Sequence, residues 1–103
     1  MPDQSVLIEI IQEIVEEVVP DKIILFGSRA KEEQKKESDY DICVLKKKIL
    51  HKRELAQRIY MKLDVNVPVD IIVETPERFN ELKDNPFLIY NEIAKYGRVV
   101  YEK

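Results

Sequence analysis

Four short apolar runs rich in β-branched residues constrain the fold most, because they alternate with longer segments of helical period. These runs, which we expect to be strands, lie at 21–26, 39–45, 67–74 and 98–102. The segments with helical spacing or helix-start signals lie at 5–19, 50–63, 76–83 and 85–97. The polar segment 28–37 predicts a short exposed helix and loop. This alternation predicts an α/β fold: a small mixed sheet of three or four strands with flanking helices, in a single domain over residues 1–103.

Prolines and a glycine mark the expected element ends. Pro20 ends the first helix, because proline lacks the backbone N–H that a helix interior needs. Thr75 and Asn85 each precede a proline, so we expect them to be the N-caps of two short helices. Gly97 is the expected end of the last helix. Pro68, at the start of its strand, favours an edge strand or a first strand position.

Composition excludes several classes of protein. The chain has 17 Lys and Arg against 20 Asp and Glu, a net charge of −3, which argues against general nucleic-acid binding. No apolar stretch reaches the roughly 20 residues of a membrane-spanning helix. The single cysteine, Cys43, cannot form an internal disulfide and is expected in the core. These features predict a globular protein of the reducing cytoplasm, with no membrane partner.

Two aspartates flank Tyr40 at the start of the second predicted strand. Residues i and i+2 of a strand face the same side, so Asp39 and Asp41 project together with Cα atoms about 6.5–7 Å apart. Adjacent carboxylates repel unless a cation lies between them. Oxygen ligands without nearby His or Cys favour Mg²⁺ or Mn²⁺, and two such ions can share both side chains.

A third acid, Asp70, lies within the apolar run of the third predicted strand. A charge there is costly unless it is used, and pairing of segments 39–45 and 67–74 would complete a three-carboxylate cluster. A plainer interpretation stays open at this point. Asp39 would then cap a turn, Asp41 would be an exposed strand residue, and Asp70 would have no chemical role.

Gly27 and Ser28 directly follow the first predicted strand. A glycine at this point lets an anion approach the backbone, and a serine hydroxyl is a suitable donor to a phosphate oxygen. Arg29 lies beside them as a candidate phosphate contact. An ordinary tight turn is the alternative for Gly27 and Ser28 alone. Neither the Walker loop nor the dinucleotide-binding glycine pattern occurs in the chain.

The combined pattern resembles a known family. It consists of Gly-Ser, ten residues, Asp-x-Asp, and a further acid on another strand, and it lies mainly in the stretch FGSRAKEEQKKESDYDICV. This is similar to the signature of the polymerase-β-like nucleotidyltransferase superfamily, and the short chain is similar to its minimal nucleotidyltransferases (MNT). Members often have Arg-Gly where this chain has Lys31 and Glu32.

The resemblance implies roles for individual residues. Gly27 and Ser28 would hold the triphosphate of ATP. Asp39 and Asp41 would bind two Mg²⁺ ions, and Asp70 would join one of them and help to activate the attacking hydroxyl. Many members are antitoxins that act beside a HEPN-domain ribonuclease, and some inactivate it by moving AMP onto a tyrosine.

Three hypotheses about function follow. The first is a Mg²⁺-dependent transfer of AMP from ATP to a hydroxyl, expected to be a tyrosine, of a HEPN-type toxin. The second is an antitoxin that neutralises its toxin by binding alone, within a homo- or hetero-oligomer. The third, transfer to a small molecule such as an aminoglycoside, normally uses an added domain that this sequence lacks. An intact set of three acids favours the first, while Lys31 and Glu32 leave the second open.

Overall fold

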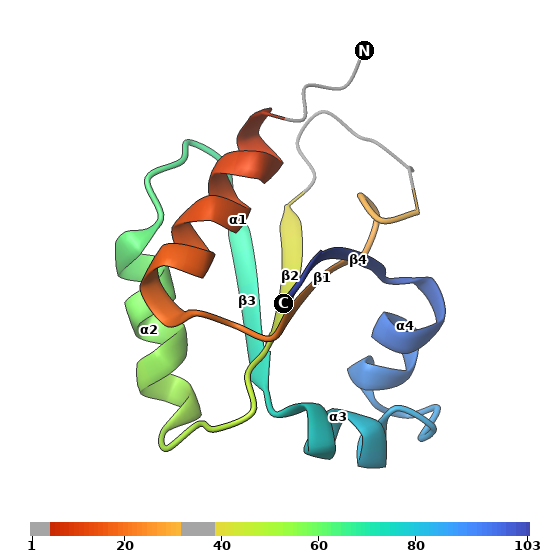
Figure 1. Ribbon diagram of the computed structural model, residues 1–103. Coiled ribbons are helices and arrows are strands. Elements are labelled where there is room, and N and C mark those ends of the chain that lie inside the picture. Colours follow the sequence, from red (N-terminus) through yellow and green to blue (C-terminus); the bar gives the residue numbers. More distant parts are fainter. Residues whose placement is uncertain (1–4, 32–38) are drawn as a thin grey trace.

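A computed structural model describes residues 5–31 and 39–103, and these form a four-stranded sheet with four helices (Figure 1). In chain order the elements are α1 (Ser5–Val18), β1 (Lys22–Phe26), β2 (Tyr40–Leu45), α2 (Lys52–Lys62), β3 (Val69–Glu74), α3 (Pro76–Leu82), α4 (Ile89–Tyr96) and β4 (Arg98–Glu102). The predicted α/β class and the mixed sheet are confirmed. None of the helices in the described part of the chain is long and apolar enough to cross a membrane.

The sheet has the strand order β3-β2-β1-β4. β1 pairs antiparallel with β2 and with β4, whereas β2 and β3 are parallel. Parallel neighbours need a crossover connection, and α2 supplies it between β2 and β3. β3 lies at one end of the strand order, so it is an edge strand, as Pro68 before it predicts.

One face of the sheet is covered by α1 and α2, which pack side by side (Figure 1). Alternate residues of β1 and β2 point to this face, and the helices contribute isoleucines to the same core. Its fully buried large side chains are Ile10, Ile14, Ile23, Ile42 and Ile59.

The other face carries α3 and α4, on the opposite side of the sheet in Figure 1. A smaller core here contains Phe26, Cys43, Phe79 and Ile93. Phe79 of α3 also meets the Tyr90 ring of α4 edge to face, with centroids 5.8 Å apart. Cys43 is buried in this core as predicted, and burial, with a smaller effect of the Glu74 charge, raises the pKa of its thiol to about 12. The thiol is therefore an inert core group.

Two helix ends match the prediction from sequence. Thr75 is the N-cap of α3, and its hydroxyl accepts a hydrogen bond from the Arg78 backbone N–H. Helix α1 ends at Val18, just before Pro20, through Val19 with a φ of 48°. Local side-chain chemistry fixes these boundaries, so a single sequence is sufficient to place them.

The predicted start of α4 is wrong. Asn85 does not cap this helix, which begins at Ile89 with Leu88 as its N-cap. The Asn85 side chain instead accepts a hydrogen bond from the Phe87 backbone N–H, so it closes a local turn that delays the helix. Gly97 is the C-cap as predicted.

The predicted helix and loop at 28–37 is only partly testable. Residues 28–31 form a turn, closed by a 3.4 Å hydrogen bond from Lys31 N–H to the Gly27 carbonyl. The rest of that segment, Glu32 included, lies outside the described residues.

Glu74, at the end of β3, is a buried charge that ties three helices to the sheet. It is 3% exposed and accepts hydrogen bonds from Lys52 Nζ of α2 at 3.1 Å and from the Tyr90 hydroxyl of α4 at 2.9 Å. The Thr75 backbone N–H, at the start of α3, donates a third bond. Burial acts to raise the pKa of Glu74, but these three hydrogen bonds outweigh it and lower the pKa.

We predict that Glu74→Gln lowers the free energy of unfolding at pH 7 by about 2 kcal/mol, because hydrogen bonds to a buried charge are lost. The folded pKa of Glu74 is lowered, so its contribution is present above the usual glutamate value of 4.5 and disappears as the pH falls through the folded pKa. The gap between wild type and variant should therefore narrow below pH 4.5. Urea unfolding at several pH values measures it.

The matched control is Glu81→Gln. Glu81 pairs with Arg78 at 3.2 Å, but both side chains are exposed. Its loss should change stability by less than about 0.5 kcal/mol at any of these pH values. Equal effects of the two substitutions would contradict the role given to Glu74.

Candidate active site

The parallel pairing of β2 and β3 brings the predicted acids together. In its register, Asp41 lies directly opposite Asp70, and Asp39 precedes β2 by one residue. The side chains of Asp41 and Asp70 share the sheet face of α3 and α4, because residues two apart on each strand, Cys43 and Ile72, pack into that core. Asp39 and Asp70 are exposed, and Asp41 is half-buried.

Burial and neighbouring negative charges both raise the pKa of Asp41. Burial is the largest cause that raises its pKa, followed by the charge of Asp70. The charge of Asp39, a side-chain hydrogen bond with Asp70 and the charge of Glu92 raise the pKa of Asp41 further. All of these effects destabilise the ionised form of Asp41, whereas a bound cation would stabilise it.

Gly27 packs directly against the Asp41 carboxylate. Its φ of 75° lies in the left-handed region, which residues with a Cβ rarely adopt. A Cβ at this position would also overlap Oδ2 of Asp41. Two constraints therefore require glycine here, and they place the turn after β1 in contact with the acids. The sequence predicted this turn as a phosphate-binding loop.

The two residues after Gly27 lie in the turn and are partly exposed. The guanidinium of Arg29 stacks on the Tyr40 ring, 3.8 Å from its centroid. Tyr40 belongs to the core under α1 and α2, whereas Asp41 faces the other side. The structure thus places Ser28 next to Gly27, which contacts Asp41, and stacks Arg29 on a side chain of the opposite sheet face. The phosphate contacts of both residues stay predictions.

Lys31 and Glu92 form a link between the turn and α4 that the strand motifs do not reveal. Lys31 Nζ lies 3.7 Å from Glu92 Oε1 and 4.8 Å from the centroid of the Tyr96 ring. Glu92, in the first turn of α4, also raises the pKa of Asp41. Since α4 reaches the site only through tertiary packing, no local sequence signal identifies Glu92 as a fourth acid beside the site.

The donor set fits a hard divalent cation in its chemistry. The neighbouring side chains are carboxylates, and their mutual repulsion is what a Mg²⁺ or Mn²⁺ ion would relieve. Within residues 5–31 and 39–103, however, no three His, Cys, Asp or Glu side chains already stand in position to hold one ion together. Asp41 and Asp70 are nevertheless near enough for each charge to oppose the other.

Comparison with known proteins identifies the family. The family model of the polymerase beta nucleotidyltransferases matches residues 9–103, nearly the whole chain. The chain belongs to this family. The matched range includes the acids and the glycine turn that the structure brings together. No curated protein matches the chain.

Solved structures share the nucleotidyltransferase fold. A chain of a toxin–antitoxin complex with AMP-PNP has a TM-score of 0.63 at 24% identity, over 92% of this chain and 72% of that one. A candidate nucleotidyltransferase from Sulfolobus solfataricus gives 0.61 at 22%, over 99% and 91%. A chain of a complex between the tri-AMPylated HEPN toxin of Shewanella oneidensis and its MNT antitoxin gives 0.50 at 21%, over 94% and 67%.

We predict that Gly27→Ala destabilises the nucleotidyltransferase through two separable effects. The positive φ costs about 1–2 kcal/mol for any residue with a Cβ. The overlap with Asp41 adds a packing cost of about 1–3 kcal/mol. In an Asp41→Ala background only the first cost should remain, which a double-mutant cycle by urea unfolding measures. An identical cost in both backgrounds would show that the contact with Asp41 does not matter.

A second prediction concerns charge repulsion. Without metal, in EDTA at pH 7, Asp41→Asn should raise the melting temperature, because it removes the charge that burial and Asp70 oppose. Asp84→Asn, in an exposed turn, is the control and should leave the melting temperature unchanged. A lower melting temperature for Asp41→Asn would mean that the carboxylates do not repel as described.

Proposed function

We propose that this chain is a Mg²⁺-dependent nucleotidyltransferase that moves AMP from ATP to a tyrosine hydroxyl of a HEPN-type toxin, and so acts as its antitoxin. The register that sets Asp41 opposite Asp70 is the observation that carries this proposal. Membership of the polymerase beta nucleotidyltransferase family supports the reaction class. The shared fold with chains of an AMP-PNP complex and of an AMPylated-toxin complex supports the substrate and the partner.

In the proposed site, the turn after β1 binds the nucleotide and the acids at β2 and β3 bind the metal ions. The backbone at Gly27 and the Ser28 hydroxyl bind the triphosphate next to Asp41. Asp39, Asp41 and Asp70 would hold the cations, two Mg²⁺ ions with Mn²⁺ as a substitute. When bound, these ions would neutralise the triphosphate and stabilise charge on the attacking and leaving oxygens.

Asp70 is the group best placed for the acceptor. It lies on the edge strand β3 and is exposed, so a side chain of another protein can reach it. In the proposed step Asp70 takes the proton of the acceptor hydroxyl, whose oxygen then attacks the α-phosphorus of ATP. The bond between the α-phosphorus and the bridging oxygen breaks, and pyrophosphate leaves with the electron pair.

With α-labelled ATP and Mg²⁺, this nucleotidyltransferase should label the toxin encoded beside it, and mass spectrometry should find added AMP on a tyrosine. Asp39→Asn and Asp70→Asn should each abolish labelling, because they remove a metal ligand and the proton acceptor. Ser28→Ala should only weaken it, because backbone N–H groups still bind phosphate. Asp84→Asn, remote from the acids in sequence, should label like the wild type.

An antitoxin that acts by binding alone gives a different result. The purified pair would then form a tight complex without added AMP, and Asp70→Asn would still neutralise the toxin. That outcome would overturn the proposed transfer.

A further inference from the structure

A pocket lies on the sheet face of α3 and α4, at the end of the strands away from the acids. Its volume is about 590 Å³, within the range of about 300–1,000 Å³ for ligand pockets. Asp41 pairs with Phe26 at one end of β1, whereas the pocket is lined by Lys22 and Leu45, which pair at the other end. The two sites are therefore about 13 Å apart along the strand.

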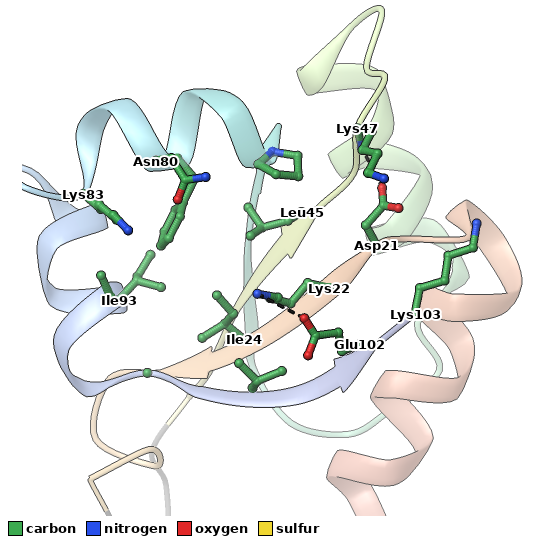
Figure 2. Close-up of a pocket in the computed structure, with 15 residues that line it drawn as sticks. Asp21, Lys22, Ile24, Leu45, Lys47, Asn80, Lys83, Ile93, Glu102 and Lys103 are labelled. Carbon is green, nitrogen blue, oxygen red and sulfur yellow. Dashed lines mark hydrogen bonds and ion pairs between the residues drawn. The ribbon is translucent and has the colours of Figure 1, made fainter.

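The floor of this pocket is formed by apolar side chains at the edge of the smaller core, and these are themselves almost fully buried. Ile24 and Leu45 come from the central strands, with Ile93 of α4 on the helix side (Figure 2). Phe79 of α3 also lines the pocket. Val99, on the edge strand β4, is 53% exposed and continues the floor to the rim of the sheet. Val99 is thus the exposed apolar contact that the groove offers, beside the free edge of the sheet.

The rim of the groove is basic, although the whole chain carries a net charge of −3. Four lysines line it, at positions 22, 47, 83 and 103, against the two acids Asp21 and Glu102. Both acids are already engaged. Glu102 pairs with Lys22 at 3.3 Å, and Asp21 accepts a 2.7 Å hydrogen bond from the Lys47 backbone N–H.

The four lysines therefore exceed the two acids by two charges, and three of the ammonium groups form no ion pair in the described part of the chain. Within the described residues, the ammonium groups of Lys47, Lys83 and Lys103 have no carboxylate partner. Figure 2 shows Lys83 on one side of the pocket and Lys47 and Lys103 on the other. An occupant of complementary charge would carry carboxylates at both of its sides and an apolar group between them.

We propose that this groove docks an acidic, amphipathic segment of the protein that accepts the AMP. The inference rests on the proposed function for the identity of that protein. A small anion fits the groove less well, because the lysines stand on opposite sides and do not converge on one point. No buried side-chain polar atom of residues 5–31 and 39–103 lacks a hydrogen-bond partner, so no fixed donor awaits a phosphate there.

Docking at the groove would position the acceptor for the chemistry. A segment held by Lys47 and Lys83 lies on the same sheet face as the acids, about 13 Å along β1. A tyrosine on a neighbouring part of the partner would then reach Asp70. The groove should therefore determine affinity for the partner protein and leave the reaction itself unchanged.

The test is binding of the purified toxin by the variant Lys47→Glu/Lys83→Glu, measured by calorimetry. The Kd for the toxin should rise at least tenfold, while the Kd for MgATP stays unchanged and shows that the variant is folded. In AMP transfer, the KM for the toxin should rise with kcat unchanged. Lys48→Glu makes one of these two charge reversals one residue away from Lys47, at a different pocket, and should bind like the wild type.

Each other outcome has a definite meaning. Wild-type toxin affinity in the double variant overturns the groove and leaves the proposed function intact. A wild-type chain that binds MgATP but no toxin overturns both. Chemical shifts of Lys83 that respond to inorganic phosphate would assign the groove to a small anion, and a dimer lost in the double variant would assign it to a second copy. Either result overturns the docking proposal.

Discussion

The parallel pairing of β2 with β3 is the constraint on which the site depends. It sets Asp41 opposite Asp70 on one sheet face, where burial and like charge both oppose ionisation of Asp41. A slip of one residue would turn the side chain of Asp70 to the face of α1 and α2. The hydrophobic pattern prevents such a slip, because Val73 packs into the core under those helices while Ile72 packs on the other side.

β3 carries two acids on the same face, Glu74 and Asp70, and their surroundings differ. Glu74 is buried, but three hydrogen bonds lower its pKa and make it a structural group. Asp70, four residues earlier, lies beside Asp41 and adds to the repulsion there. A fold that compensates one carboxylate so fully and leaves another beside like charge is consistent with a site that stability alone does not explain.

Local rules account for the parts that the sequence predicts well. The i, i+2 spacing of Asp39 and Asp41, the N-cap at Thr75 and the glycine after β1 each depend on a few adjacent residues. Asn85 shows the limit of such rules, since its side chain closes a turn in place of capping α4. The stacking of Arg29 on a core tyrosine is a tertiary contact that local patterns cannot indicate.

Long-range packing decides the remaining features. Glu92 reaches the site because α4 crosses the sheet, and its pairing with Lys31 depends on where the turn after β1 lies. The groove beside α4 depends on how α3 and α4 pack against the ends of β1, β2 and β4. Neither the positions of the helices on the sheet nor the groove beside them can be predicted from the hydrophobic periodicity of the sequence. The placement of the acids and of the glycine turn on their strands is thus more predictable than the surfaces of this nucleotidyltransferase.

The most direct measurement of the central claim is a crystal structure with Mn²⁺ and AMP-PNP, with manganese located by its anomalous signal. The account predicts manganese bound by Asp41 and by Asp39 or Asp70, at metal–oxygen distances of about 2.1–2.2 Å, with the triphosphate against Gly27 and Ser28. It also predicts that shared coordination relieves the repulsion between Asp41 and Asp70. Nucleotide bound without manganese at Asp41, or bound away from the glycine turn, would contradict it.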